Sequence, residues 1–155
     1  MEGSRPKAIR VTRRLLRVLD AHVKEHRLVQ VTPPEAVYDF EHTGQPNTGL
    51  LPDIGFYHAA REAMVTDDQP YPFAPDLAIE IASPLQKQAD MDAEARRYLA
   101  GGAALVWVVW PHTRLVDVWR SSTMSRPART LSVGDMLDGA DVVTGFTYAV
   151  ADLFR

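Results

Sequence analysis

The sequence contains no cysteine, which excludes disulfide bonds and zinc sites built on thiolates. It also lacks an apolar run of about 18 residues, so it predicts no membrane-spanning helix and no membrane partner. Residues 1–14 are rich in arginine and contain no apolar segment of the kind that a secretory signal needs. Neither a glycine-rich phosphate loop nor a dinucleotide-binding motif is present. We therefore expect a cytoplasmic protein.

What remains is an ordinary globular composition, with 46% hydrophobic and 24% charged residues in a chain of 155. This length suits one domain, which we expect to span residues 1–155. The net charge of −3 is unevenly spread, because residues 1–30 are strongly basic and residues 31–95 strongly acidic. A basic segment can contact phosphate groups, and clustered carboxylates can bind a cation. A solvated basic helix followed by acidic loops would give the same distribution.

The basic segment is predicted to be an amphipathic helix over residues 8–27. Its apolar side chains recur every four residues, at Val11, Leu15, Leu19 and Val23. A second row on this helix is basic, and we interpret it as a DNA-contacting face, with a solvated face as the alternative. The row consists of Arg10, Arg13, Arg14 and Arg17.

The rest of the chain alternates between strands and one more helix. Alternation of apolar and small residues predicts a strand over 77–82 that carries Glu80, and Ser83, Pro84 and Gln86 form a capping box that predicts a helix start. That helix should end at Gly101. Further strands are predicted over residues 28–31, 36–40, 53–57, 104–110 and 115–119, with a loop over 42–51 and a long turn over 61–73. The order predicts an α/β fold in which helices flank one mixed sheet.

Two carboxylates on consecutive predicted strands form the first candidate site. Asp53 opens one strand and Glu80 lies within the next, so the two side chains can converge on one divalent cation if the strands are neighbours. Oxygen ligands suit Mg²⁺, which can activate a water for attack on a phosphodiester. An edge strand whose Glu80 face meets solvent is the alternative. Asp76 lies too close to Glu80 in sequence to be the first ligand, and we expect it to orient the strand start.

Several segments occur in an order and spacing that resemble the Uma-type restriction endonuclease family of the PD-(D/E)XK nuclease superfamily. They are residues 74–84 (APDLAIEIASP), Asp90, residues 97–102 (RYLAGG), residues 106–111 (VWVVWP) and the closing segment 143–154. The resemblance implies a restriction-endonuclease-like mixed sheet flanked by helices. It also implies that Asp53 and Glu80 bind the metal, with the carbonyl group of Ile81 as a backbone ligand. The metal would be Mg²⁺, with Mn²⁺ as the alternative, the substrate would be DNA, and a homodimer stays open.

The sequence departs from the family pattern at the lysine that the family carries on the second helix. Glu94 occupies that position, four residues before Tyr98, and reverses the charge that would stabilise the transition state. If the helix extends back to Ser83, Lys87 lies on nearly the same face as Glu94, so we interpret Lys87 as a replacement cation; an exposed lysine at the helix start is the alternative. Glu94 could instead pair with Arg97. A catalytically impaired protein that binds or regulates is therefore the second functional hypothesis.

Two other patterns are weaker candidates. His22, Glu25 and His26 match the letters of a zinc motif, but a third ligand is not evident, and His26 at a helix end explains the pattern equally well. The three tryptophans, Trp107, Trp110 and Trp119, lie in or beside predicted strands. We interpret them as core residues rather than as platforms on which bases stack.

Overall fold

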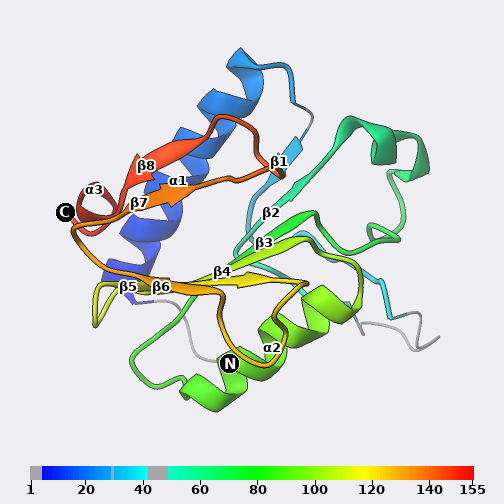
Figure 1. The fold of residues 1–155 in the computed structure, drawn as a ribbon. Helices are drawn as coiled ribbons and strands as arrows, with labels where there is room; N and C mark the ends of the chain where they lie inside the picture. Colours follow the sequence, from blue (N-terminus) through cyan, green and yellow to red (C-terminus); the bar gives the residue numbers. More distant parts are fainter. Residues whose placement is uncertain (1–4, 29, 42–48) are drawn as a thin grey trace.

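A computed structural model describes residues 5–28, 30–41 and 49–155 of the chain. In these residues the central element is a six-stranded mixed sheet whose strands lie side by side in chain order (Figure 1). Strands β3 and β4 are parallel and all other neighbours are antiparallel. The strands are β1 (Gln30–Thr32), β2 (Ile54–Tyr57), β3 (Leu77–Ile81), β4 (Leu105–Trp110), β5 (Leu115–Arg120) and β6 (Arg129–Leu131).

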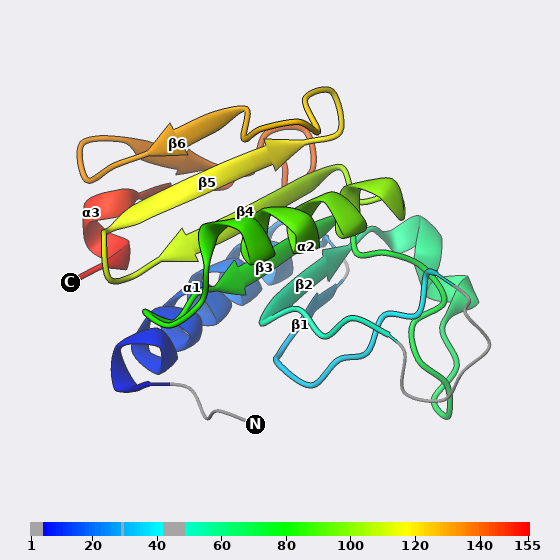
Figure 2. The same ribbon diagram turned by 90° about the horizontal axis from the view of Figure 1, so that it is seen from below.

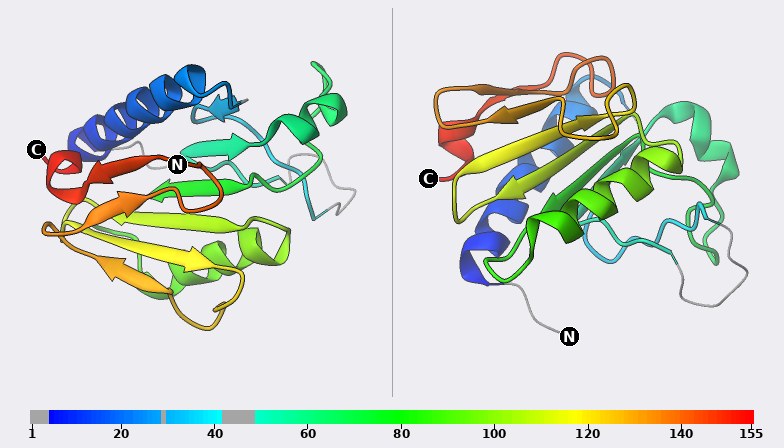
Figure 3. Two further views of the ribbon diagram at one scale, coloured as in Figure 1. Left: turned by 45° about the horizontal axis from the view of Figure 1, so that its top comes forward. Right: turned by 60° about the horizontal axis from the view of Figure 1, so that its bottom comes forward.

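Two long helices cover opposite faces of this sheet. Helix α1 (Pro6–Glu25) buries its apolar row against one face, and α2 (Gln88–Ala100) connects β3 to β4 across the other face (Figure 2). The hairpin β7 (Met136–Asp138) and β8 (Thr147–Ala149), followed by α3 (Val150–Leu153), lies beside α1 (Figure 3). No helix in the described part of the chain is long and apolar enough to cross a membrane.

The alternation along β3 decides which face receives Glu80. Ile79 and Ile81 belong to the core under α1, whereas Ala78 and Ala82 belong to the core under α2. Because side chains alternate along a strand, Glu80 shares the α2 face with the two alanines. The small alanines leave room for α2 to lie close to the sheet, which brings polar side chains of this helix to Glu80.

Most predicted elements are present, with one consequential difference at the start of α2. The predicted capping box forms in part, since the Gln86 side chain accepts a hydrogen bond from the Ser83 N–H at 2.8 Å. These residues form a turn rather than helix, and α2 begins only at Gln88. Lys87 precedes the helix with extended backbone angles, φ −86° and ψ 145°. The predicted helix start at Ser83 is therefore wrong, because the turn closes on itself before the helix begins.

Other differences concern short elements. The predicted strand over 36–40 contributes only single bridges of Tyr38 to Leu50 and Tyr71. The predicted turn over 61–73 begins with a 3₁₀ helix, η1 (Ala59–Met64). Strands β6 and β7 were not predicted, because three-residue strands carry too little alternation to be read from a sequence. Most of the predicted loop over 42–51, residues 42–48, lies outside the described residues.

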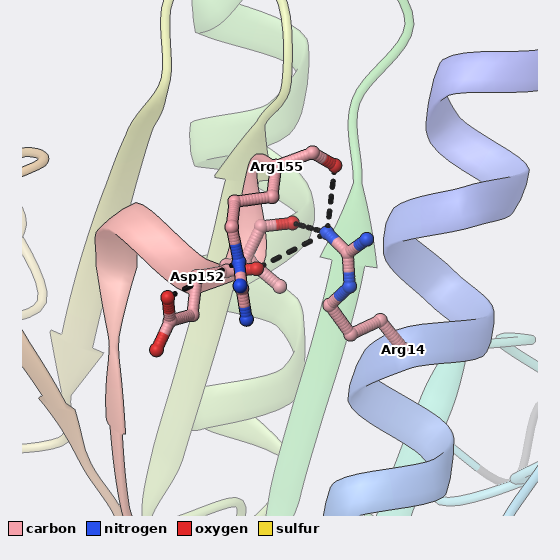
Figure 4. A network of polar contacts seen from close by, with 4 residues as sticks. Arg14, Asp152 and Arg155 are labelled. Carbon is pink, nitrogen blue, oxygen red and sulfur yellow. Dashed lines mark hydrogen bonds and ion pairs between the residues drawn. The ribbon is translucent and has the colours of Figure 1, made fainter.

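Arg14 fastens the end of the chain to α1 (Figure 4). Its Nη1 atom donates hydrogen bonds to the carbonyl oxygens of Leu153 at 2.8 Å, Arg155 at 3.0 Å and Asp152 at 3.1 Å. These are the carbonyl groups at and after the last turn of α3, which have no partner within that helix. The negative end of the helix dipole also stabilises a cation at this position. Arg14 thus has a structural contact that its place in the basic row did not predict.

We expect Arg14→Met to lower the free energy of unfolding by about 1–2 kcal/mol, because hydrogen bonds from a charged donor are lost while the aliphatic packing is kept. Urea denaturation followed by circular dichroism measures this change. Arg17→Met is the matched control, since Arg17 is an exposed arginine of the same row. Equal stability of the two variants would contradict a structural role for Arg14.

Candidate functional site

Asp53 and Glu80 converge because of the register between β2 and β3. These strands are antiparallel, and Ile54 pairs with Ile79. One step further along this register, Asp53 falls opposite Glu80, and opposed residues of an antiparallel pair point to the same face. Asp53 and Glu80 are near enough to share a hydrogen bond that lowers the pKa of Asp53 in opposition to its burial. The structure thus brings together the two carboxylates that the sequence singled out.

Asp53 is held immediately before the first residue of β2. Its Oδ2 atom accepts a hydrogen bond from the Ile81 N–H at 2.7 Å, so the carboxylate continues the ladder in place of a further β2 residue. The N–H and C=O groups of one strand residue point to the same neighbouring strand. The carbonyl group of Ile81 therefore faces the edge at which Asp53 lies, where the family resemblance expects a backbone ligand.

Glu80 is buried among polar partners from α2. It is only 8% exposed, and its Oε1 atom accepts a hydrogen bond from the Tyr98 hydroxyl at 2.9 Å. Burial raises the pKa of Glu80 well above its usual range, and the negative charges of Glu94 and Asp53 raise it further. Burial likewise raises the pKa of Asp53, although the hydrogen bond from Ile81 opposes it. The protonated form of Glu80 is thus favoured more strongly than that of an ordinary glutamate, and the neighbouring carboxylates add to this effect.

The donor set of this cluster fits a hard divalent cation. Within the described residues, no three His, Cys, Asp or Glu side chains form a ready-made metal cluster. Mg²⁺ does not require one, since it is commonly bound by one or two carboxylates and keeps several waters. Burial raises the pKa of both carboxyl groups, and nearby negative charge raises it further. A divalent ion would favour their ionised forms. Asp53, Glu80 and the carbonyl group of Ile81 are the groups that could hold it.

Lys87 forms no ion pair with these carboxylates. Lys87 lies before α2, is exposed, and forms no ion pair with any described residue. Its predicted relation to Glu94 required both residues to lie on one helix, so the interpretation of Lys87 as a replacement cation loses its geometric basis. Glu94 does not pair with Arg97 either, since Arg97 binds Glu41 at 2.7 Å.

Glu94 instead faces the carboxylate pair. It lies on α2 one turn before Tyr98, and it acts on the pKa of Glu80 through its charge and through a hydrogen bond. The contact between Tyr98 and Glu80 was not predicted from the sequence. The available signal was the spacing of four residues between Glu94 and Tyr98, which places both on the same side of a helix.

The basic row of α1 borders the same site from the other side. Arg13 and Asp53 line one cleft of about 190 Å³, together with Ile9, Thr12, Leu16 and Pro34. Arg10, Arg13 and Arg17 are exposed, and none of them forms an ion pair within the described chain. The guanidinium group of Arg14 is directed to the end of α3 instead. Three arginines of the row are thus available to a ligand that reaches Asp53.

Two remaining candidates have structural contacts. His22 Nε2 lies 2.9 Å from the carbonyl oxygen of Thr144, and His26 Nδ1 lies 2.9 Å from the carbonyl oxygen of His22, so a backbone group occupies one nitrogen of each ring. Asp76 accepts a hydrogen bond from the His58 N–H at 2.8 Å and lies 3.4 Å from Arg61. Asp76 thereby holds the segment before β3, as the sequence predicted.

A mixed sheet flanked by helices, with two carboxylates facing each other on adjacent strands, defines the class of restriction-endonuclease-like α/β folds. The sequence model of the Uma2 family, described as "Putative restriction endonuclease", matches residues 1–151, and the chain belongs to this family. The resemblance seen in the sequence is thereby confirmed.

The fold agrees with a solved structure. A crystal structure described as a "putative nuclease belonging to DUF820 from Anabaena variabilis ATCC 29413" superimposes with a TM-score of 0.79 at 20% sequence identity. The match covers 99% of this chain and 83% of the other. A comparison with curated proteins gives no match. The predicted restriction-endonuclease-like fold is confirmed.

Proposed function

We propose that residues 1–155 form a Mg²⁺-dependent endonuclease domain that hydrolyses DNA phosphodiester bonds, with Mn²⁺ as the alternative metal. The observation that carries this proposal is the pair of Asp53 and Glu80, which face each other at the start of β2 in a chain of the Uma2 family. Their oxygen atoms are the donors that Mg²⁺ prefers.

Each residue of the site has a distinct task in this proposal. Asp53 and Glu80 would hold the ion, which when bound would polarise the phosphate and lower the pKa of a water. Tyr98 fixes the orientation of Glu80 through its hydroxyl group, and the Ile81 N–H fixes Asp53. Glu94 adds a negative charge where a cation would stabilise the transition state, so we expect the wild-type rate to be low.

Nicking of supercoiled plasmid in the presence of Mg²⁺ or Mn²⁺ tests the proposal. We expect slow nicking by the wild type and none by Asp53→Asn or Glu80→Gln, because each substitution removes one charged ligand while keeping the shape of the side chain. Asp90→Asn, at an exposed position in the first turn of α2, is the matched control. Nicking that persists in Asp53→Asn would contradict the proposed metal site.

The DNA-binding face in this proposal is the row of Arg10, Arg13 and Arg17, since Arg13 shares a cleft with Asp53. Each lost phosphate contact lowers the slope of log affinity against log salt by about 0.9. We therefore expect Arg13→Ala with Arg17→Ala to flatten this slope by up to about two units in a filter-binding titration. Arg129→Ala is the control, because Arg129 is exposed on β6 at the other edge of the sheet. An unchanged slope would remove α1 from the interface.

A second candidate function is a nuclease-fold protein that binds DNA without cleaving it. The specific observation in its favour is the contact of Glu94 with Glu80, which places a negative charge where the family carries a lysine. DNA binding that depends on α1, together with an absence of nicking at any divalent ion concentration, would favour this function over the endonuclease.

A further inference from the structure

A depression of about 300 Å³ lies where β3 and β4 end and β5 begins, next to the first turn of α2. Its volume is at the lower end of the range for small-ligand sites. It is separate from the cleft that Arg13 and Asp53 share. Its walls come from the β3–α2 turn, the β4–β5 turn and the sheet, and they include Ser83, Gln88, Trp110, His112, Thr113 and Asp117.

Trp110 gives this depression a firmly held aromatic wall. Trp107 and Trp119 are fully buried, whereas Trp110 is partly exposed. The indole N–H of Trp110 donates a hydrogen bond to Asp117 Oδ2 at 3.1 Å. Asp117 is itself buried and accepts further hydrogen bonds from Gln88 at 3.0 Å and from Thr130 at 2.9 Å. The sequence predicted that Trp110 is a core residue. In the structure Trp110 also forms part of the wall of this depression.

Three polar side chains in the lining of this depression are available to a ligand. Within the described residues, no hydrogen-bond partner is found for the side chains of Ser83, His112 or Thr113. No lysine or arginine lines the depression. A flat aromatic ligand with hydrogen-bonding groups at its edge fits beside Trp110 and these polar side chains. A phosphate group would have no lysine or arginine in the lining to bind it.

The depression is near the carboxylate pair. Ala82, which lines it, lies two residues after Glu80 on the same face of β3, a separation of about 7 Å along the strand. This distance corresponds to roughly two steps of a nucleic-acid strand, at about 3.4 Å each. A base held in the depression would thus belong to a nucleotide close to a phosphate at Glu80.

We propose that this depression binds a nucleobase of the nucleic-acid substrate, stacked on Trp110 and contacted at its edge by Ser83, His112 and Thr113. The inference rests on the proposed function, since it assigns to the same active site a pocket for a nearby nucleotide. Stacking on an aromatic side chain tolerates any base. A preference for one base over another would therefore come from hydrogen bonds with Ser83, His112 and Thr113.

Binding of mononucleotides tests this site without cleavage. We expect dAMP and dTMP to quench the tryptophan fluorescence of the wild type saturably, because the other two tryptophans are buried. Deoxyribose 5-phosphate, which lacks the base, should leave the fluorescence unchanged. Equal responses to nucleotide and sugar phosphate, or no saturable response to any of them, would overturn the proposal.

Substitutions of Trp110 and His112 test whether these side chains bind the base. Measured by saturation-transfer NMR with dAMP, Trp110→Leu should weaken binding roughly 10- to 100-fold, and Trp110→Phe, which keeps an aromatic face, should weaken it much less. His112→Ala should weaken binding several-fold, with His26→Ala, at the exposed residue that follows α1, as the matched control. If Trp110→Leu does not fold, Trp110→Phe and His112→Ala decide the outcome. Affinity that is the same in the folded Trp110 and His112 variants as in the wild type would overturn the proposal.

The two proposals fail separately. Nucleotide binding that depends on Trp110, found in a protein that never nicks plasmid, would support the base pocket and contradict the endonuclease. Metal-dependent nicking by a protein in which Trp110→Leu changes no nucleotide affinity would contradict the base pocket alone.

Discussion

Glu94→Lys is expected to raise the rate of metal-dependent plasmid nicking by about 10²–10³ over the wild type. Removing a single group that stabilises charge in a transition state typically costs this factor, and the wild type carries the opposite charge at this position. Glu94 faces Glu80, so an ammonium group there would lie beside the carboxylates and the bound phosphate. It would also favour the ionised form of Glu80, which is the form that binds a metal.

We expect the higher nicking rate of Glu94→Lys to require the proposed metal ligands. Glu94→Lys combined with Glu80→Ala should show no nicking, and Glu94→Gln should show a smaller gain than Glu94→Lys, because it removes a charge without reversing it. Fast wild-type nicking that disappears on Lys87→Ala would contradict the placement of Lys87 outside the site. Fast nicking that survives Lys87→Ala would show that this site needs no cation.

Glu80→Gln is expected to stabilise the protein while it abolishes the proposed activity. A carboxyl group whose pKa is raised by folding contributes fully below its ordinary pKa of 4.5 and loses this contribution as the pH rises through the raised value. Glutamine keeps the acceptor for Tyr98 and brings an amide donor to the neighbouring carboxylates, without a charge to bury. We expect the free energy of unfolding to rise by about 1–3 kcal/mol at pH 8.

Urea denaturation at pH 4 and pH 8 measures this prediction. The advantage of Glu80→Gln should vanish at pH 4, where glutamate is protonated in both the folded and the unfolded chain. Asp90→Asn, in the first turn of α2, serves as the control for loss of an exposed carboxylate. Added Mg²⁺ should stabilise the wild type more than Glu80→Gln, because binding to the folded state alone adds stability. A variant that is less stable than the wild type at pH 8 would contradict the raised pKa of Glu80.

Local spacing was enough to predict the elements that carry the site. The four-residue recurrence from Val11 to Val23 is sufficient for an amphipathic helix, and α1 buries those residues. The alternation around Glu80 is sufficient for a strand with two distinct faces, and β3 has them. These features depend only on the geometry of a helix or a strand, which is the same in every protein. The resemblance to the Uma-type family rests on segments that span much of the chain, and it too could be seen without coordinates.

The local signals were less informative where two structures compete for the same residues. The capping box at Ser83 is equally compatible with a helix start and with a closed turn, and the structure has the turn. That choice left Lys87 outside the helix, so its predicted place on the same face as Glu94 does not hold. Likewise, the spacing of the arginine row does not distinguish a ligand contact from a contact within the chain.

Contacts between distant segments were decided only by the tertiary structure. The register of β2 on β3 set Asp53 opposite Glu80, and the packing of α2 turned Glu94 toward them. Arg14 found its partners 138 to 141 residues away, at the end of α3. Which residues share a face of a helix or a strand can be read from the order of the amino acids, because it follows from backbone periodicity. Which faces meet was determined by how the whole chain buries its apolar surface, and no local spacing records that choice.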